Sequence, residues 1–364
     1  MRLDSLLDYF RGKAVTIPPM DGALRPNTAL DDGAAELLEA AAPDNLAAGG
    51  GHVFYSTGND LLRLPAYGEG GPAAVARFDA PVGALACSPD GAIAIALDDG
   101  RILIKDGTLD GKTLTPTDFG GLACPTALAF ADAGTLLVCQ GSSAHRASDW
   151  VVDLMSKNAS GSLWRVDLAA GRASKLAGDL AFPYGVLANA AGGGVVVAES
   201  WRHRLLRIGT EGGGSEPVLT KLPGYPARLA PTADGGAWLC LFAPRNRLIE
   251  FVLEEDAYRA DMMREVERAH WIAPALSSGA GFLEPLQCGG VKTMGIHKPW
   301  SPTRSYGLLV RLDRTLRPVA SFHSRANGRR HGITSVIEAG GRVLAASQGG
   351  NAILAIDTRA EAGA

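Results

Sequence analysis

Short segments in which apolar and polar residues alternate recur along most of the chain. HVFYS (52–56), AIAIAL (92–97), VVVAES (195–200) and RVLAAS (342–347) show this pattern most clearly. A period of two places alternate side chains on opposite faces of a strand, so these segments are typical of half-buried β-strands. Glycine-rich turns follow or precede them and supply the positive φ angles that tight hairpins require. The pattern predicts many short strands joined by hairpins.

These strands are grouped into a repeating unit, in which an apolar run, a glycine-rich turn, an alternating strand, a second polar turn and another strand follow one another. Six such units occur, at residues 45–64, 84–104, 127–141, 185–208, 228–251 and 332–357. Several of them begin about 42 residues apart, which is the spacing of propeller blades. We therefore predict an all-β fold, a six-bladed β-propeller formed as one domain by residues 43–360.

Two parts of the chain depart from the strand pattern. Residues 254–272 carry apolar residues at helical spacing, and we expect one helix there, inserted between propeller strands as a cap over one mouth of the channel. A helix that only packs on the rim is the alternative. Residues 1–42 precede the first unit and are expected to form an N-terminal extension that packs on the propeller, with a short helix in DDGAAELLEAAAPD (31–44).

Composition narrows the classes of partner. The formal net charge of −3 gives no electrostatic reason to expect nucleic acid or an anionic membrane as a partner. No apolar run is long enough to span a bilayer. The five cysteines are scattered and form no CxxC pair, which indicates a reduced cytoplasmic protein.

Three stretches resemble a known family. FPYGVLANAAGGGVVVAESWRHRLLRI (182–208), LPGYPARLAPTADGGAWLCL (222–241) and the region 306–347 are similar to strictosidine-synthase-like proteins. These belong to the wider SMP-30/gluconolactonase and paraoxonase-like group of six-bladed propellers. The resemblance implies the propeller fold, and it implies a reaction among those of the group: lactone and ester hydrolysis, phosphotriester hydrolysis, or the condensation carried out by the plant enzymes.

The resemblance also implies where a metal would bind. Hydrolytic members hold a divalent cation, usually calcium, with one acid and several Asn or Asp residues from the innermost strands. In this chain the position of the acid is filled by Asp44, but the other positions carry Pro125 or Thr126, Tyr184 and Arg228. We therefore predict no metal and no other cofactor, with calcium as the alternative. The glutamate of the condensing enzymes is replaced by Ile333, which argues against strictosidine synthesis.

The remaining polar residues define a candidate site at the channel mouth. A histidine beside a carboxylate or tyrosine can act as a general base, and an arginine can bind a carboxylate or oxyanion. The candidate catalytic residues are His331, Tyr184 and Asp44. The candidate substrate-binding residues are Arg228, Glu199, His203, His145, Arg304 and Tyr306. Each could instead bond a neighbouring residue, and Glu199 could form an inter-blade salt bridge with Arg202 and Arg204.

These residues predict an enzyme that acts on a small, anionic or lactone-like molecule by hydrolysis or by lyase-type proton transfer. The alternative is a non-catalytic propeller that binds a ligand or a partner protein.

Overall fold

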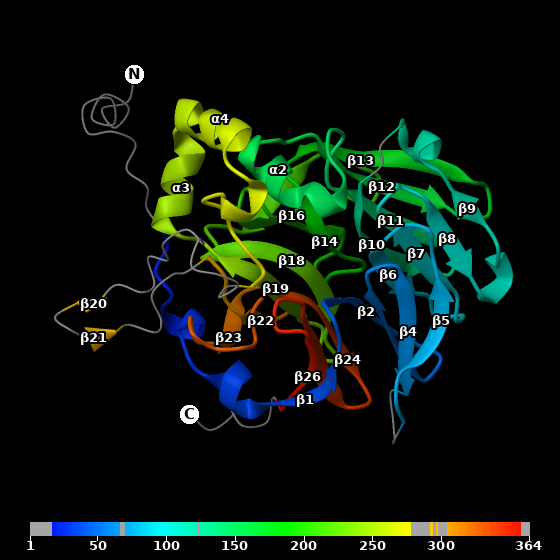
Figure 1. The fold of residues 1–364 in the computed structure, drawn as a ribbon. Helices are drawn as coiled ribbons and strands as arrows, with labels where there is room; N and C mark the ends of the chain where they lie inside the picture. The colour runs from blue at the N-terminus through cyan, green and yellow to red at the C-terminus, as the bar shows by residue number, and fades with distance from the viewer. Residues whose placement is uncertain are drawn as a thin grey trace.

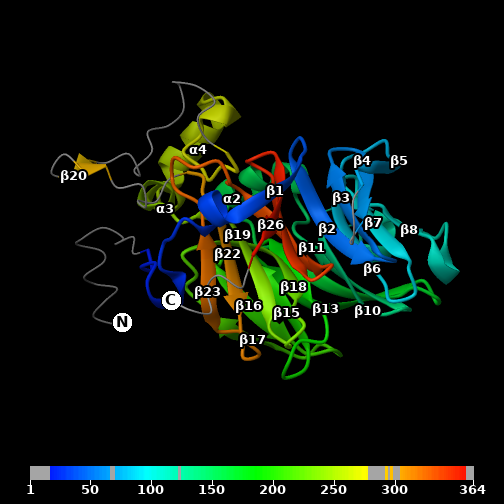
Figure 2. The same cartoon turned by 90° about the horizontal axis from the view of Figure 1, so that it is seen from below.

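The computed structural model describes residues 17–65, 70–121, 124–277, 292–293, 296–297 and 304–357. It confirms the predicted propeller: six antiparallel four-stranded sheets stand around a common axis (Figures 1 and 2). The innermost strand of each blade contacts those of both neighbouring blades, and the last of these contacts, between the first and sixth blades, closes the ring.

Blades one to three follow the chain order. Blade one contains β2 (Pro43–Gly49), β3 (His52–Thr57), β4 (Asp60–Pro65) and β5 (Ala73–Arg77). Blade two contains β6 (Val82–Cys87), β7 (Ile93–Leu97), β8 (Ile102–Lys105) and β9 (Thr113–Leu114). Blade three contains β10 (Pro125–Asp132), β11 (Thr135–Gln140), β12 (Gly161–Asp167) and β13 (Arg172–Leu180).

Blades four and five also follow the chain order, although blade five has an insertion between its second and third strands, and blade six takes its outermost strand from the N-terminal region. Blade four contains β14 (Pro183–Leu187), β15 (Val195–Glu199), β16 (Arg204–Ile208) and β17 (Ser215–Leu219). Blade five contains β18 (Gly224–Pro231), β19 (Ala237–Pro244), β22 (Leu308–Leu312) and β23 (Pro318–His323). Blade six contains β24 (Ile333–Ala339), β25 (Arg342–Ser347), β26 (Ala352–Ile356) and β1 (Ala34–Glu39).

The outermost strand of blade six comes from the N-terminal region. Strand β1 pairs with β26 from Ala34 opposite Ile356 to Glu39 opposite Ala352, and both figures show the two strands side by side. The short helix expected at 31–44 is therefore wrong over this strand, although a π-helix, η2 (Ala29–Gly33), precedes it. Strand pairing with the end of the chain overrides the helical preference of the Ala, Leu and Glu residues here.

The insertion in blade five contains two helices where one was expected. Helix α3 (Arg247–Glu254) and helix α4 (Asp256–Glu265) lie between β19 and β22, with β20 (Lys292–Thr293) and β21 (Ile296–His297) later in the same interval. The repeat unit at 228–251 predicts its last strand at residues 247–251, and this prediction is wrong because these residues are helical. The Asn246 side chain accepts a hydrogen bond from Leu248 N at 2.8 Å and caps α3, and Ile249, Val252 and Leu253 share one buried face.

The helices gather at the end of the propeller where the innermost strands begin (Figures 1 and 2). Helix α2 (Trp150–Met155) belongs to the long loop of blade three and lies there with α3 and α4. The remaining helical turns are η1 (Gly22–Leu24), η3 (Gly107–Leu109), η4 (Pro116–Phe119), η5 (Ala147–Asp149) and η6 (Arg268–His270). We call the end of the propeller where α2, α3 and α4 lie the helix side of the channel.

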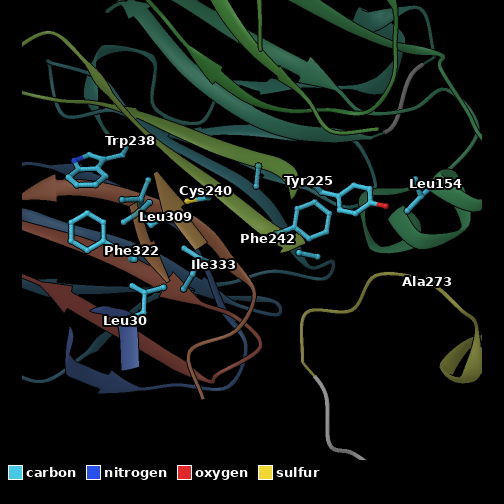
Figure 3. Close-up of a cluster of buried hydrophobic side chains, with 14 of the residues drawn as sticks. Leu30, Leu154, Tyr225, Trp238, Cys240, Phe242, Ala273, Leu309, Phe322 and Ile333 are labelled. Atoms are coloured by element: carbon cyan, nitrogen blue, oxygen red, sulfur yellow. The ribbon is translucent and has the colours of Figure 1, made fainter. Parts of the chain in front are cut away.

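A large apolar cluster joins the helices to blades five and six. Figure 3 shows Tyr225 and Phe242 together at one end of the cluster and Trp238, Phe322 and Leu30 at the other. The buried residues of α3 and α2 pack against the Tyr225 and Phe242 end. The insertion is thus part of the core of the protein.

No helix in the described part of the chain is long and apolar enough to cross a membrane. The four cysteines described, Cys87, Cys124, Cys139 and Cys240, carry free thiols; Cys288 lies outside the described residues.

The N-terminal region should contribute measurably to stability. Leu30 is fully buried against the blade-six core, whereas Leu37 in β1 is 41% exposed. We expect Leu30→Ala to lower the free energy of unfolding by about 2–5 kcal/mol because it leaves a cavity. Leu37→Ala, the matched control, should change it by less than about 0.5 kcal/mol. Urea unfolding followed by fluorescence would measure both, and equal midpoints would contradict the assignment.

Candidate functional site

Three of the predicted site residues meet at the centre of the propeller. Arg228 of β18 donates from Nη1 to both carboxylate oxygens of Asp44 in β2, at 2.9 and 3.1 Å. The ring of Tyr184 in β14 lies 4.9 Å from the guanidinium carbon, a cation–π contact. Thr334 of β24 donates from Oγ1 to Asp44 Oδ1 at 2.7 Å. Asp44 and Arg228 are 9% and 8% exposed, so their charges neutralise each other in a buried setting.

Main-chain carbonyl groups complete the surroundings of Arg228. Nη1 also donates to the carbonyl of Thr334 at 3.4 Å, and Nη2 donates to the carbonyls of Gly83 at 2.7 Å and Thr126 at 3.4 Å. Both terminal nitrogens therefore have two partners inside the protein. This set of contacts favours a structural role for Arg228 over the capture of a substrate anion, which stays a prediction.

The catalytic roles of Asp44 and Tyr184 likewise stay predictions. Burial raises the pKa of Tyr184 to about 12, so the phenol keeps its proton near neutral pH. The Asp44 carboxylate is engaged by Arg228 and Thr334. Neither group is poised to take a proton from a substrate.

His331 does not join this centre. It lies just before β24, where its Nδ1 is 2.8 Å from Ser305 Oγ and its Nε2 is 2.9 Å from the carbonyl of Arg325. Burial lowers its pKa. Within the described part of the chain, no hydrogen bond or ion pair links His331 to Asp44, Tyr184 or Arg228. Its role as a general base stays a prediction that these contacts do not favour.

Arg304 and Tyr306 lie before β22, and their contacts are with Trp271 and His323. Arg304 donates from Nη1 to the carbonyl of Trp271 at 3.3 Å. Tyr306 is buried, and its ring meets the edge of His323 with the centroids 5.7 Å apart. Neither contact involves the Arg228 centre.

Glu199, the last residue of β15, is fully buried and makes ion pairs. Its carboxylate accepts hydrogen bonds from Ala181 N at 2.8 Å, from Arg202 Nη1 at 2.6 Å and from Arg204 Nε. The salt-bridge alternative describes these contacts, but the pairs lie within blade four and not between blades. Both carboxylate oxygens thus have partners within the protein, and a substrate-binding role for Glu199 stays a prediction.

His203 belongs to a buried polar cluster that ties blade four to helix α3. Its Nε2 is 3.6 Å from Glu250 Oε1 of α3, and its ring packs on Tyr225 with centroids 4.6 Å apart. Glu250 also accepts from Tyr225 Oη at 3.2 Å and from Arg245 Nη2 at 2.6 Å. Burial lowers the pKa of His203 to about 4, so the ring is neutral at pH 7.

His145 has the partner that a general base needs. Its Nδ1 is 3.0 Å from Oδ2 of Asp153, a fully buried residue of α2 that sequence reasoning missed. Asp153 also accepts from Asn158 Nδ2 at 2.6 Å and from Trp201 Nε1 at 2.8 Å. The side chain of His145 is 24% exposed. A buried carboxylate that fixes one ring nitrogen leaves Nε2 available to solvent or a substrate.

An aromatic layer connects this pair to the centre. The indole of Trp201 stacks on Phe182 with centroids 4.5 Å apart, and Phe182 meets the edge of Tyr184 at 5.7 Å. Trp150, the first residue of α2, and Phe242 extend the layer. The His145–Asp153 pair thus lies on the helix side, separated from Arg228 by aromatic rings.

A cavity of about 540 Å³ lies at the other end of the channel. All six innermost strands line it, through residues 46–48, 85–87, 127–130, 186–189, 228–231 and 335–338. On each strand these residues follow those that contact the guanidinium, so the cavity lies beyond Arg228 from the helices. Its walls are mainly Ala, Leu, Val, Ile and Phe, which suits an apolar ligand.

Comparisons with known proteins agree with the fold. No family model matches the chain. Regucalcin from Agrobacterium tumefaciens, described as a calcium-binding protein, superposes with a TM-score of 0.53 and 14% identity, covering 90% of this chain and 93% of that one. A gluconolactonase from Xanthomonas campestris gives a TM-score of 0.53 and 12% identity, covering 90% and 88%. The chain therefore shares the fold of gluconolactonase- and regucalcin-like six-bladed propellers.

One curated protein is similar over a shorter stretch. The adipocyte plasma membrane-associated protein of Homo sapiens is 28% identical over 111 residues. The match spans 30% of this chain and only 27% of that protein.

A divalent cation does not fit the centre of this propeller. Among the described residues, Asp44 is the only carboxylate that bonds Arg228, and its oxygens already face the guanidinium. The described residues contain no group of three or more His, Cys, Asp or Glu side chains that could hold a metal ion. Calcium requires six to eight oxygen ligands, several of them charged, and here a fixed cation occupies the position.

The buried state of His203 predicts a pH dependence of stability. The folded pKa is about 4, whereas an unfolded histidine titrates near 6.5. As the pH falls from about 6.5 to 4, only the unfolded state takes up this proton, so stability decreases by about 2 kcal/mol at pH 5. His203→Asn should lose less stability than the wild type between pH 7 and pH 5 in urea titrations. Asparagine tolerates the φ of 48° at this position, and equal losses would contradict the assignment.

Proposed function

We propose that the protein is an enzyme of the hydrolase or lyase type that acts on a small molecule at the helix side of the channel, with His145 as its general base. The observation that carries this proposal is the His145–Asp153 pair, in which a fully buried carboxylate contacts Nδ1 of a partly exposed ring. Such a pair holds one tautomer and stabilises the imidazolium that forms during proton transfer.

Lactone or ester hydrolysis needs no metal in this scheme. His145 Nε2 takes a proton from a water molecule while the water oxygen bonds to the carbonyl carbon of the substrate. The bond from that carbon to the ring or ester oxygen then breaks, and the leaving oxygen takes the proton back from the imidazolium. For a lyase, the same nitrogen takes a proton from the carbon next to a carboxylate, and the electron pair of that C–H bond forms a C=C double bond. The bond from the neighbouring carbon to the leaving group breaks at the same time, and the leaving group takes the proton back from the imidazolium. The indoles of Trp150 and Trp201 would bind the apolar part of the substrate.

We also propose that the chain belongs to the strictosidine-synthase-like group, that its substrate is anionic or lactone-like, and that it resides in the cytoplasm. The segment 199–207, with its Trp201 and its arginine-rich end, supports the first of these. Free thiols at the four described cysteines suit a reducing compartment.

The other candidate function is the binding of a ligand without catalysis. The apolar cavity at the end away from the helices favours it, because its volume suits a small molecule and its polar side chains have protein partners. Glu338, for example, accepts a hydrogen bond from Trp238 Nε1 at 2.8 Å.

Replacement of His145 distinguishes the proposed enzyme from a protein that only binds a ligand. The wild type is assayed against lactones, aryl esters and small carboxylates, and His145→Gln is then compared on every compound that turns over. We expect kcat/KM to fall at least about 100-fold, the usual contribution of a general base, with an unchanged Tm. His52→Gln is the matched control, since His52 lies in the β3 hairpin and bonds the carbonyl of Gly50.

Two results would contradict the proposal. If His145→Gln keeps its activity, the base lies elsewhere, and His331→Asn becomes the variant to assay. If the wild type turns over no compound, but an apolar ligand raises its Tm and Leu128→Glu in the cavity wall abolishes that rise, the protein is a binding propeller.

A further inference from the structure

Each of the five other blades contributes a contact to the guanidinium of Arg228, which blade five carries. Blade one supplies the Asp44 carboxylate, and blades two, three and six supply the carbonyl oxygens of Gly83, Thr126 and Thr334. Blade four supplies the face of Tyr184, and blade five supplies the arginine itself. Six segments far apart in the sequence thus converge on one planar cation.

The backbone is irregular at the same place in all six innermost strands. The pairing with the second strand skips at Asp44–Ala47, Val82–Ala84, Pro125–Ala127, Pro183–Gly185, Pro226–Leu229 and Ile333–Ser335. A residue skipped in this way is left out of the ladder. Gly83, Thr126 and Thr334 are such residues, and their carbonyl oxygens accept hydrogen bonds from Arg228.

These groups form the kind of shell that binds a cation. It consists of a carboxylate, three carbonyl oxygens and the negative face of an aromatic ring. Without a cation, the Asp44 charge would be buried with only the Thr334 hydroxyl as a nearby donor, which is costly. The guanidinium matches the shell better than an ammonium would, because its planar fork lets two terminal nitrogens reach acceptors on four blades. Its Nε has no partner among the described residues.

We infer that the centre of this propeller is a cation site whose cation is the chain's own Arg228, and that this tethered guanidinium holds the six blades together without a metal. The inference is independent of the proposed function, because the His145–Asp153 pair does not contact this centre. It implies that a variant without the side chain has a vacant site for guanidinium. The cavity on the far side of Arg228 provides access to it.

The test compares Arg228→Ala with Arg228→Lys and with Arg77→Ala, the control, whose side chain is 75% exposed. We expect Arg228→Ala to lower the Tm by about 5–15 °C, since it leaves a buried charge unpaired. The lysine variant keeps the charge and should lose less. The control should shift by about 1 °C or less.

Rescue by a free cation identifies the cause. Guanidinium chloride at tens of millimolar, well below denaturing concentrations, should raise the Tm of Arg228→Ala and leave that of the wild type and of Arg77→Ala unchanged or slightly lower. If the alanine variant is insoluble, the soluble yield of its refolding with and without guanidinium chloride is the readout, against sodium chloride at equal ionic strength.

Three results would overturn the inference. Arg228→Ala could be as stable as the control; its loss could persist in guanidinium chloride; or calcium chloride could raise the Tm of the wild type but not of Asp44→Asn. The last result would show that a metal binds beside the arginine.

Discussion

The ion pair between Arg228 and Asp44 is the interaction on which the centre of this protein depends. Both groups are buried, and a buried charge is stable only when its partner and its remaining hydrogen-bonding atoms are satisfied. The terminal nitrogens of Arg228 also donate hydrogen bonds to carbonyl oxygens from three further blades. The side chain of Arg228 therefore links its own blade to four others at the axis through hydrogen bonds.

This centre divides the channel into two environments. On the helix side, aromatic rings cover Arg228 and support the His145–Asp153 pair. On the other side lies an apolar cavity. A propeller that holds a metal at this point places a Lewis acid between the two ends. Here both terminal nitrogens of the cation have partners inside the protein, whereas its buried Nε has none among the described residues. The proposed general base, His145, lies instead on the long loop of blade three.

The fold was largely predictable because a repeated unit leaves a periodic trace in the sequence. The errors lie where the repeat is interrupted. Residues 247–251 fall where the repeat places a strand, but the Asn246 cap and the packing of Ile249 and Val252 in the core of blade five favour a helix. Residues 34–39 favour a helix locally, yet they complete a sheet whose other strands lie more than 290 residues further along the chain. No local pattern in the sequence predicts that strands from the two ends of a chain will pair.

The sequence by itself determined the repeat of the blades, and its resemblance to a family of six-bladed propellers implied that Asp44, Tyr184 and Arg228 stand at equivalent positions of the innermost strands, which share an axis. Only the tertiary structure decided that these groups satisfy one another, that His331 has partners elsewhere, and that Asp153 supports His145. The reason is physical: strand periodicity fixes the direction of a side chain, whereas its hydrogen-bond partners depend on loops and helices whose course no period in the sequence specifies.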